Sequence, residues 1–193
     1  MKGRPRSFDL DDVLTKAMHV FWRHGYEGAS LARLQEATGL TPPSVYNAFG
    51  SKEGLYEACL DHYAGGPGAR PVSALSGVPR RAGIRAFLVA AAHEFTRPGQ
   101  PPGCMISTAA LALSPDLDPV AGTAAARRAA TLGLVADYLA RAQAGGALSP
   151  DADPTTLARF FGAVIQGMSV QAHDGATVAE LTALADVALA AWA

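Results

Sequence analysis

The sequence predicts an all-α protein, and three observations support this fold class. Apolar residues make up 49% of the chain and aromatic residues only 7%, while alanine is abundant, a composition typical of helical proteins. Apolar residues recur every three or four positions in several segments that glycine and proline separate. No segment alternates apolar and polar residues as a half-buried strand would, and no longer internal repeat occurs.

The first helix is predicted from about Leu10 to His24. Asp9 is a suitable N-cap, and the acidic residues that follow it complement the positive end of the helix dipole. Gly25 is expected to end the helix. The apolar residues form two adjacent rows, a stripe wide enough to pack on two further helices, and these rows are Val13, Ala17, Phe21 and Leu14, Met18, Trp22.

Two short helices joined by a glycine turn are predicted over about 30–49. Ser30 is a suitable N-cap for the first, and Gly39 lies where the chain must reverse. Thr41 can cap the second helix. Pro42 in its first turn costs no hydrogen bond, because that N–H would have no partner within the helix anyway.

Val45 and Phe49 lie four positions apart in the second of these helices, so both side chains are expected to point inward. Ser51 then caps a third helix that reaches about Tyr63. This is the layout of a helix-turn-helix, whose second helix enters a DNA groove. The outer surface of that helix is expected to carry Thr41, Ser44, Tyr46, Asn47 and Ala48.

These motifs resemble the tetracycline-repressor (TetR) family of bacterial transcriptional regulators. The resemblance is close over residues 6–64 and weaker beyond, and it is carried by the runs Gly25-Tyr26-Glu27-Gly28-Ala29-Ser30, Ala37-Thr38-Gly39-Leu40 and Tyr46-x-x-Phe49-x-Ser51-Lys52-Glu53. It implies that residues 1–64 form a helix-turn-helix domain that binds double-stranded operator DNA. Residues 65–193 would then form a larger helical domain that binds a small, largely apolar inducer and holds a homodimer together.

The groove helix departs from the family pattern, because Pro42 stands where relatives often carry Lys or Arg. Residues 41–49 contain no cation, so this helix cannot make the bidentate guanine contacts of Arg or Lys. Tyr46 and Lys52 match the family's phosphate-contacting pair, while hydroxyl, amide and proline groups remain for the bases. The residues expected to contact DNA are Arg4, Arg6, Ser30, Thr41, Pro43, Ser44, Tyr46, Asn47 and Lys52.

The net charge of −1 does not exclude DNA binding, because positive charge is concentrated near the N-terminus. All three lysines lie in the first 52 residues, and residues 1–7 hold three cations and no acid. Other interpretations stay open: Arg4 and Arg6 in a solvated tail, Tyr46 as a packing residue, and Thr41 as a cap alone.

After the helix that Ser51 caps, Gly65-Gly66-Pro67-Gly68 begins a stretch rich in glycine, proline and serine. This stretch extends to about Pro79 and marks a domain boundary. Glycine and proline also separate the segments that follow. The further helices are predicted at about 80–96, 103–113, 119–144, 154–173 and 178–192.

The last two predicted helices carry apolar stripes, and Phe160 and Ile165 widen the stripe of the first of them, at about 154–173, so that this helix needs covering on two sides. One side can be the chain's own core, and the other is most simply a partner subunit in a four-helix bundle around a two-fold axis. The alternative is an ordinary core helix in a monomer. The residues expected at the dimer interface are Phe160, Phe161, Val164, Met168, Leu181, Leu184 and Ala188.

An inducer pocket is expected among the helices over 80–173, since such sites are apolar with a few polar anchors. Each polar residue also has an ordinary interpretation as a core or surface group. Cys104 is expected to be a small packing residue, with redox or electrophile sensing as the alternative. The residues expected to bind the inducer are Phe87, His93, Met105, Thr108, Tyr138, Phe161 and Gln166, with Phe95 and Leu111 as further walls.

Other classes of function are poorly supported. The run Gly28-Ala29-Ser30-Leu31-Ala32 lacks the final glycine of a nucleophile elbow, and the glycines at 65–68 precede no Lys-Ser/Thr. The five histidines are scattered, so no enzyme, metal or cofactor is expected. The two cysteines and the N-terminal residues suggest a reducing compartment and no signal peptide, hence a cytoplasmic protein with no membrane contact. The alternative to a DNA-binding repressor is a ligand-binding or protein-interaction module of the same fold that has lost operator binding.

Overall fold

The computed structural model describes residues 9–111 and 113–192, and in those residues the protein is all-helical, which confirms the predicted fold class. Short 3-10 turns at 74–76, 115–117 and 189–191 connect or end several helices. The α-helices are α1 (Leu10–Gly28), α2 (Leu31–Thr38), α3 (Pro42–Phe49), α4 (Lys52–Gly65), α5 (Ala69–Ser73), α6 (Arg81–Phe95), α7 (Met105–Thr108), α8 (Asp118–Ala144), α9 (Pro154–His173) and α10 (Val178–Ala188).

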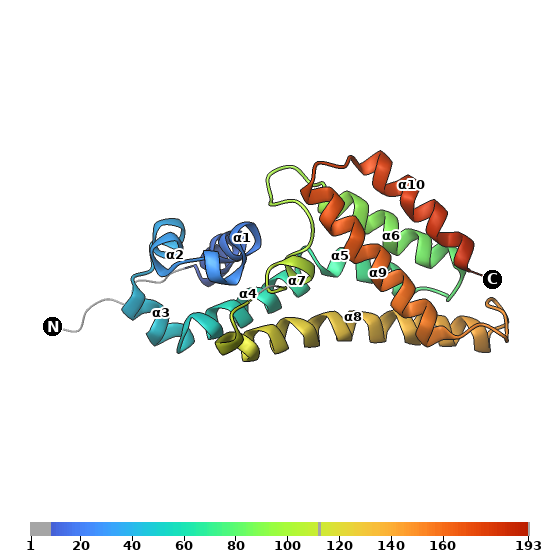
Figure 1. Cartoon of the computed structure of the whole chain (residues 1–193), viewed down its shortest axis with the longest axis horizontal. Coiled ribbons are helices and arrows are strands. Elements are labelled where there is room, and N and C mark those ends of the chain that lie inside the picture. The colour runs from blue at the N-terminus through green and yellow to red at the C-terminus, as the bar shows by residue number, and fades with distance from the viewer. Residues whose placement is uncertain (1–8, 112, 193) are drawn as a thin grey trace.

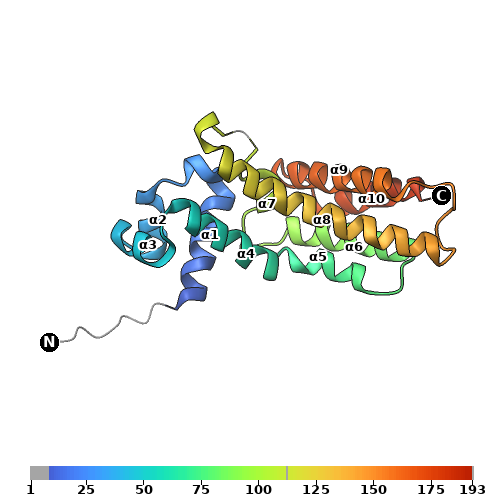
Figure 2. The ribbon, with the colours of Figure 1, turned by 90° about the horizontal axis from the view of Figure 1, so that it is seen from below.

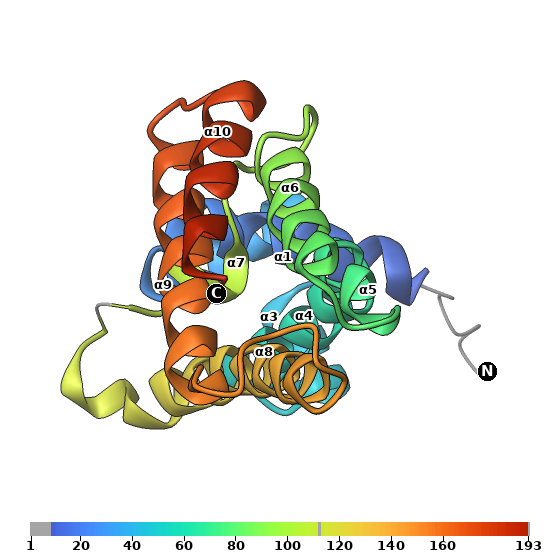
Figure 3. The ribbon, with the colours of Figure 1, turned by 90° about the vertical axis from the view of Figure 1, so that its right-hand side faces the viewer.

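The helices form an elongated molecule with α1, α2 and α3 gathered at one end (Figure 1). The long α8 runs along the molecule toward the opposite end, where α6, α9 and α10 pack together (Figure 2). Viewed along this axis, α5, α6, α8, α9 and α10 surround a central region (Figure 3). The short α7 lies between that region and the first helices.

Local capping rules explain the first helix boundaries. The Asp9 carboxylate accepts a hydrogen bond from the backbone N of Asp11 at 3.1 Å, as expected for an N-cap. The α1 helix breaks at Gly25, whose φ of 69° and ψ of 173° are not helical, and one further turn continues to Gly28. The Ser51 hydroxyl caps α4 by accepting from the backbone N of Gly54 at 3.1 Å.

Two segments differ from the sequence prediction. The stretch after α4 is not simply irregular, because Ala69–Ser73 form the short helix α5. The helix expected over 103–113 is only the four-residue α7, since the chain turns after Thr108 and the Ala109 carbonyl accepts a hydrogen bond from the backbone N of Tyr26 at 2.9 Å. A partner distant in sequence therefore decides where α7 ends.

The first hydrophobic core extends beyond the first four helices. It contains aromatic residues of α1 and α4, including Phe21, Tyr56 and Tyr63, but also Met105 of α7 and Val120 of α8. A second core fills the space among α6, α8, α9 and α10, and the half-buried Cys104 borders both. Side chains from both expected domains thus share the first core.

A second polar contact joins the end of α1 to the segment after α7. The Glu27 carboxylate accepts hydrogen bonds from the Ser114 hydroxyl at 2.6 Å and from its backbone N at 3.1 Å. These bonds hold the pKa of Glu27 below its ordinary value. Together with the bond from Tyr26 to Ala109, they make the connection after α7 a second link to the first helices, besides α4.

A buried carboxylate on α6 binds an arginine of α5. Glu94 of α6 is 1% exposed, and it accepts hydrogen bonds from Arg70 at 2.8 and 2.9 Å, from Arg97 at 3.1 Å and from the Gln100 amide at 3.0 Å. Burial alone would raise the pKa of Glu94, but these hydrogen bonds hold it below its ordinary value. The cluster therefore joins α5, α6 and the loop that follows α6.

This cluster predicts an acid-sensitive contribution to stability. Because the pKa of Glu94 is lower in the folded state, its contribution is complete above pH 4.5 and is lost as the pH falls through the folded pKa. Replacing Glu94→Gln removes the charge that both arginines bind, so the free energy of unfolding should fall by about 1–3 kcal/mol at pH 7. The loss is no larger because both arginines are half-exposed and can return to water.

The measurement is urea unfolding of wild type and variant between pH 3.5 and 7, and the difference should shrink below pH 4.5. Glu36→Gln on the exposed face of α2 is the matched control and should change stability little. A constant difference across this pH range would contradict the role given to the Glu94 carboxylate.

Candidate nucleic-acid interface and internal cavity

Residues 30–49 fold as the predicted pair of helices at the end of the molecule (Figure 1). The Ser30 hydroxyl caps α2 by accepting from the backbone N of Arg33 at 3.3 Å. Gly39 ends α2 with a φ of 75°, a left-handed conformation that favours glycine, so the chain can turn sharply into α3. On the inner face of α3, Val45 is buried and Phe49 is half-buried.

Thr41 occupies the N-cap position of α3 but makes no side-chain cap bond there. Its hydroxyl lies 3.0 Å from that of Ser44, so the two hydroxyls bond to each other at the start of the helix. The expectation that the Thr41 side chain caps α3 was therefore wrong. Both hydroxyls keep unused hydrogen-bonding capacity, because each can donate one bond and accept two.

The outer face of α3 is polar, uncharged and open to solvent. Tyr46 is 52% exposed, Pro43, Asn47 and Ala48 are exposed, and Ser44 is half-buried. Such a face can offer hydroxyl and amide groups to base edges and a phenol to a phosphate. The expected contacts from Arg4 and Arg6 lie outside the described residues.

Lys52 stands at the first residue of α4, next to this face. Its ammonium lies 4.3 Å from the ring centroid of Tyr26, and the Tyr26 hydroxyl donates a 2.7 Å hydrogen bond to the Glu53 carboxylate. Partial burial lowers the pKa of Lys52, although Glu53 and Glu27 oppose this shift. The cation–π contact and the neighbouring carboxylate hold the lysine at the start of the helix.

The junction between α3 and α4 requires a glycine. A Cβ added at Gly54 would overlap the backbone carbonyl oxygen of Phe49, which is rigid main chain at the end of α3. Only glycine lets the two helices approach this closely, and the spacing fixes the angle at which α3 is presented. A substituent here would have to push α3 away from α4.

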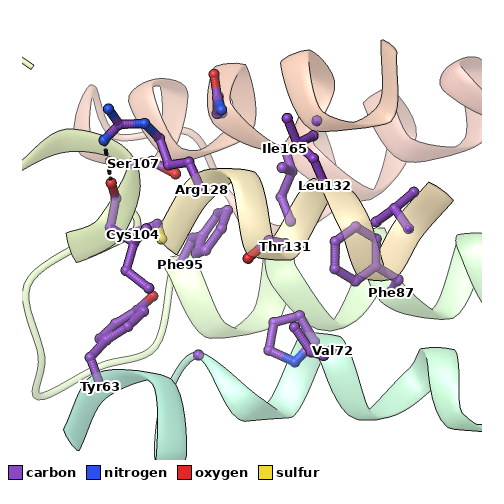
Figure 4. Close-up of a pocket in the computed structure, with 16 residues that line it drawn as sticks. Tyr63, Val72, Phe87, Phe95, Cys104, Ser107, Arg128, Thr131, Leu132 and Ile165 are labelled. Atoms are coloured by element: carbon purple, nitrogen blue, oxygen red, sulfur yellow. Dashed lines mark hydrogen bonds between the residues drawn. The ribbon is translucent and has the colours of Figure 1, made fainter. Parts of the chain in front are cut away.

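An internal cavity of about 620 Å³, including its opening to solvent, lies between α4, α5, α6, α7, α8 and α9. Figure 4 shows the Tyr63, Phe87, Phe95 and Thr131 side chains around it. Its wall is mostly apolar with a few polar groups, as is usual for a small-molecule site. The lining residues are Tyr63, Gly68, Pro71, Val72, Phe87, Phe95, Cys104, Ile106, Ser107, Arg128, Thr131, Leu132, Val135, Gly162, Ile165 and Gln166.

Phe87, Phe95 and Gln166 of the expected pocket residues lie in this lining, and the others do not. Met105, Tyr138 and Phe161 are fully buried in the surrounding cores, and the Tyr138 hydroxyl donates to the carbonyl of Arg80 at 2.9 Å. The remaining three also point elsewhere: His93 is exposed on α6, Leu111 is 64% exposed, and the Thr108 hydroxyl donates to the Cys104 carbonyl at 2.9 Å.

The sequence reasoning missed four polar residues of the cavity, Tyr63, Ser107, Arg128 and Thr131. Arg128 carried a recognisable signal, because it interrupts an apolar stripe at helical spacing on α8 that also includes Ala124 and Val135. Tyr63 was assigned to the first domain, and only the folded structure brings the end of α4 to the cavity.

The expected dimer interface divides into buried and exposed residues. Phe161, Met168 and Leu181 are 0% exposed and Ala188 is 5% exposed, so these four belong to the protomer's own core. They repeat at core spacing and therefore face inward, which corrects their assignment to the interface. Val164 and Leu184 are half-buried. Four large apolar side chains on the outside of α8, α9 and α10 are 40–74% exposed, and these are Leu134, Phe160, Val170 and Val187.

Neither metal sites nor membrane spans are found among the described residues. No group of three His, Cys, Asp or Glu side chains there could hold a metal ion. None of the helices in the described part of the chain combines the length and apolar character that a membrane crossing requires. Both cysteines are free, with Cys59 buried and Cys104 half-buried.

Comparison with protein families gives two matches that together span most of the chain. Residues 13–59 match the family described as bacterial regulatory proteins, tetR family. Residues 77–188 match the tetracyclin repressor-like C-terminal domain. The first match covers α2 and α3 with parts of α1 and α4, and the second covers the helices around most of the cavity.

Individual relatives align over nearly the whole chain. The HTH-type transcriptional repressors ComR and BdcR of Escherichia coli (strain K12) are 38% and 29% identical, covering 99% and 96% of this chain and 92% and 90% of their own length. A cysteine mutant of the TetR family transcriptional regulator CifR, solved in complex with 26-base-pair operator DNA, is 42% identical. It superposes with a TM-score of 0.94 over 98% of this chain and 100% of that chain.

The close approach at Gly54 predicts an asymmetric response to alanine within one helix. Gly54→Ala should destabilise the protein by about 1–3 kcal/mol, because the new methyl group displaces α3. Gly65→Ala is the matched control, since a Cβ at Gly65 meets nothing within 4 Å. Alanine there should be neutral or stabilising by up to about 1 kcal/mol.

The two variants are compared by urea unfolding of the full chain. Equal stabilities for Gly54→Ala and wild type would contradict the close packing of α3 on α4.

Proposed function

The chain belongs to the TetR family of bacterial regulatory proteins, whose members are DNA-binding transcriptional regulators, and we propose that it represses transcription until a small ligand enters its cavity. The observation that carries this proposal is the solvent-exposed polar face of α3 at the end of a helix-turn-helix. The names of ComR and BdcR as repressors, and the operator complex of CifR, support repression at an operator.

In the proposed complex α3 lies in the major groove of double-stranded operator DNA. Thr41, Ser44 and Asn47 would read base edges by hydrogen bonds, and the Pro43 ring would contact thymine methyl groups. Tyr46 and Lys52 would hold a phosphate, with Ser30 at the start of α2 nearby. Arg4 and Arg6 are proposed from the sequence to add phosphate contacts.

The cavity connects to this interface along two routes. Tyr63 lines the cavity at the end of α4 and packs edge-on against Trp22 of α1, with the two ring centroids 5.0 Å apart. Lys52 begins the same helix. The second route is the α7 segment. Its residues Cys104, Ile106 and Ser107 line the cavity, and its Ala109 carbonyl accepts a hydrogen bond from the backbone N of Tyr26. A ligand that shifts either segment would change the orientation of α3.

Operator recognition of this kind needs two copies of α3 at a fixed spacing, so we propose a homodimer. The outward apolar face of α9 and α10, which includes Phe160, Val170 and Val187, supplies the surface for a four-helix bundle between subunits. A ligand would release DNA by binding better to a dimer whose α3 helices have the wrong separation.

Three further assignments belong to this proposal. Residues 1–64 act as the DNA-binding domain and residues 65–193 as the ligand-binding and dimerisation domain, although their side chains share the first core. The protein works in the cytoplasm, where its operator is. Its family is one of regulators, and we assign the chain no catalytic activity.

The uncharged α3 also suits the alternative of a binding module that has lost its operator. A gel shift with the DNA flanking the protein's own gene separates the two functions. We expect the ligand-free protein to shift this DNA at lower protein concentration than a shuffled sequence, and Asn47→Ala to weaken that preference. Equal binding to both sequences by the wild-type protein would favour the alternative.

The phosphate role of Lys52 predicts a specific salt response. Lys52→Gln should weaken binding to operator and shuffled DNA by about the same factor, and lower the salt slope of log K by roughly one unit. Arg85→Gln is the matched control, because it removes one positive charge from α6, where Arg85 pairs with Asp186. The assignment fails if both variants show the wild-type slope in fluorescence anisotropy titrations.

The outward apolar face predicts the assembly state. Phe160→Glu combined with Val170→Glu should give folded monomers, because an unpaired charge would be buried at the interface. Sedimentation velocity at micromolar concentration is the measurement. Leu10→Glu on α1, which is 57% exposed, is the control and should stay dimeric. A wild-type protein that sediments as a monomer would contradict the dimer.

A further inference from the structure

The cavity has a polar end and an apolar end. In Figure 4 the Arg128 side chain lies at the α7 end, together with Ser107 and Cys104. The other end is closed by aliphatic and aromatic side chains. These are Val72, Phe87, Leu132 and Ile165.

Arg128 is the only charged side chain among the residues that line the cavity, and none of them is an acid. One of its guanidinium nitrogens donates to the backbone carbonyl of Ile106 at 3.0 Å. A guanidinium has five N–H donors, so most remain available. Within the described residues, no carboxylate lies at ion-pair distance from Arg128.

Other arginines in the structure are neutralised differently. Arg70 and Arg97 share Glu94, Arg85 pairs with Asp186, and the adjacent Arg127 pairs with Asp61 of α4. The guanidinium of Arg128 is half-buried beside an apolar wall, where an unpaired charge is unfavourable. What distinguishes Arg128 is its place in the cavity lining, which contains no carboxylate that could pair with it.

We propose that the cavity binds an apolar monocarboxylate, whose carboxylate pairs with Arg128 and whose hydrocarbon chain lies toward Phe87. The inference rests on the proposed function, because it names the chemical class of the ligand for that same cavity. A carboxylate matches the planar fork of a guanidinium and can accept two hydrogen bonds from it. Burial of the chain against the aromatic and aliphatic wall supplies the rest of the affinity.

Two further polar groups of the cavity lining favour an anion as well. The Ser107 hydroxyl and the Gln166 amide can donate hydrogen bonds to carboxylate oxygens. A ligand ammonium would meet the positive charge of Arg128 and no acid in the lining, so amines are disfavoured. A neutral alcohol would gain the apolar contacts but leave the guanidinium without a counter-charge.

The anchor also connects the ligand to α7. Arg128 binds the carbonyl of Ile106, and three residues further on the Ala109 carbonyl binds the backbone N of Tyr26. A carboxylate that draws the guanidinium toward itself also pulls on the hydrogen bond that Arg128 donates to the Ile106 carbonyl. The ligand thereby acts on the α7 segment that contacts α1.

The test compares two probes of equal chain length, octanoate and octan-1-ol, by isothermal titration calorimetry with the full-length protein at pH 7.5. We expect octanoate to bind at least about tenfold more tightly than octan-1-ol. Arg128→Gln should reduce this ratio to about one, and Arg128→Lys should retain part of it because the charge remains. Phe87→Ala should weaken both probes.

Arg127→Gln is the matched control, because it removes the adjacent arginine, which pairs outside the cavity with Asp61. It should leave the octanoate preference unchanged. The proposal is overturned if wild type binds both probes equally, if neither binds at millimolar concentration, or if folded Arg128→Gln keeps the full preference.

Operator binding by the ligand-free protein is measured separately. Failure to bind the operator would overturn the proposed function and leave octanoate binding intact as a property of the cavity. Normal operator binding without any octanoate preference would overturn the ligand class alone.

Discussion

The structure depends on one hydrophobic core that is continuous from the first helices into the rest of the chain. Aromatic side chains of α1 and α4, among them Phe21, Tyr56 and Tyr63, pack together with Met105 of α7 and Val120 of α8. Burial within this core raises the pKa of Tyr56 to about 12, because a buried phenolate would lose its hydration. Because such a core is close-packed, a displacement of α7 or of the end of α4 has to be accommodated by the helices that carry α3.

Polar contacts at the two ends of α4 connect this shared core to α3 and to the cavity. At the outer end of α4, Lys52, Tyr26 and Glu53 form one contact group beside α3. At the inner end, Tyr63 faces the cavity, and Ala109 holds the backbone of Tyr26 from the α7 side. Tyr26 therefore receives contacts from both routes, which makes it the residue where a change in the cavity can reach the DNA-binding face.

The sequence predicted those features that depend on local rules. Ser30, Gly39 and Ser51 act as predicted because capping and left-handed turns need only neighbouring residues. The prediction assigned the inner faces of α9 and α10 to a subunit interface, whereas they belong to the core of the protomer. Periodicity indicates that a residue is buried, but it does not identify the surface that covers it. The length of α7 and the role of Arg128 depend on partners far along the chain, so local patterns could not define them.

The central claim is that occupancy of the cavity and binding of operator DNA are coupled, and linkage tests it most directly. The measurement is the dissociation constant of the operator, by fluorescence anisotropy, as octanoate is raised through its own binding range. Operator affinity should fall, and octanoate should bind the operator complex more weakly than the free protein by the same factor. The two sites are not coupled if octanoate binds the cavity with its ordinary affinity while operator affinity stays constant.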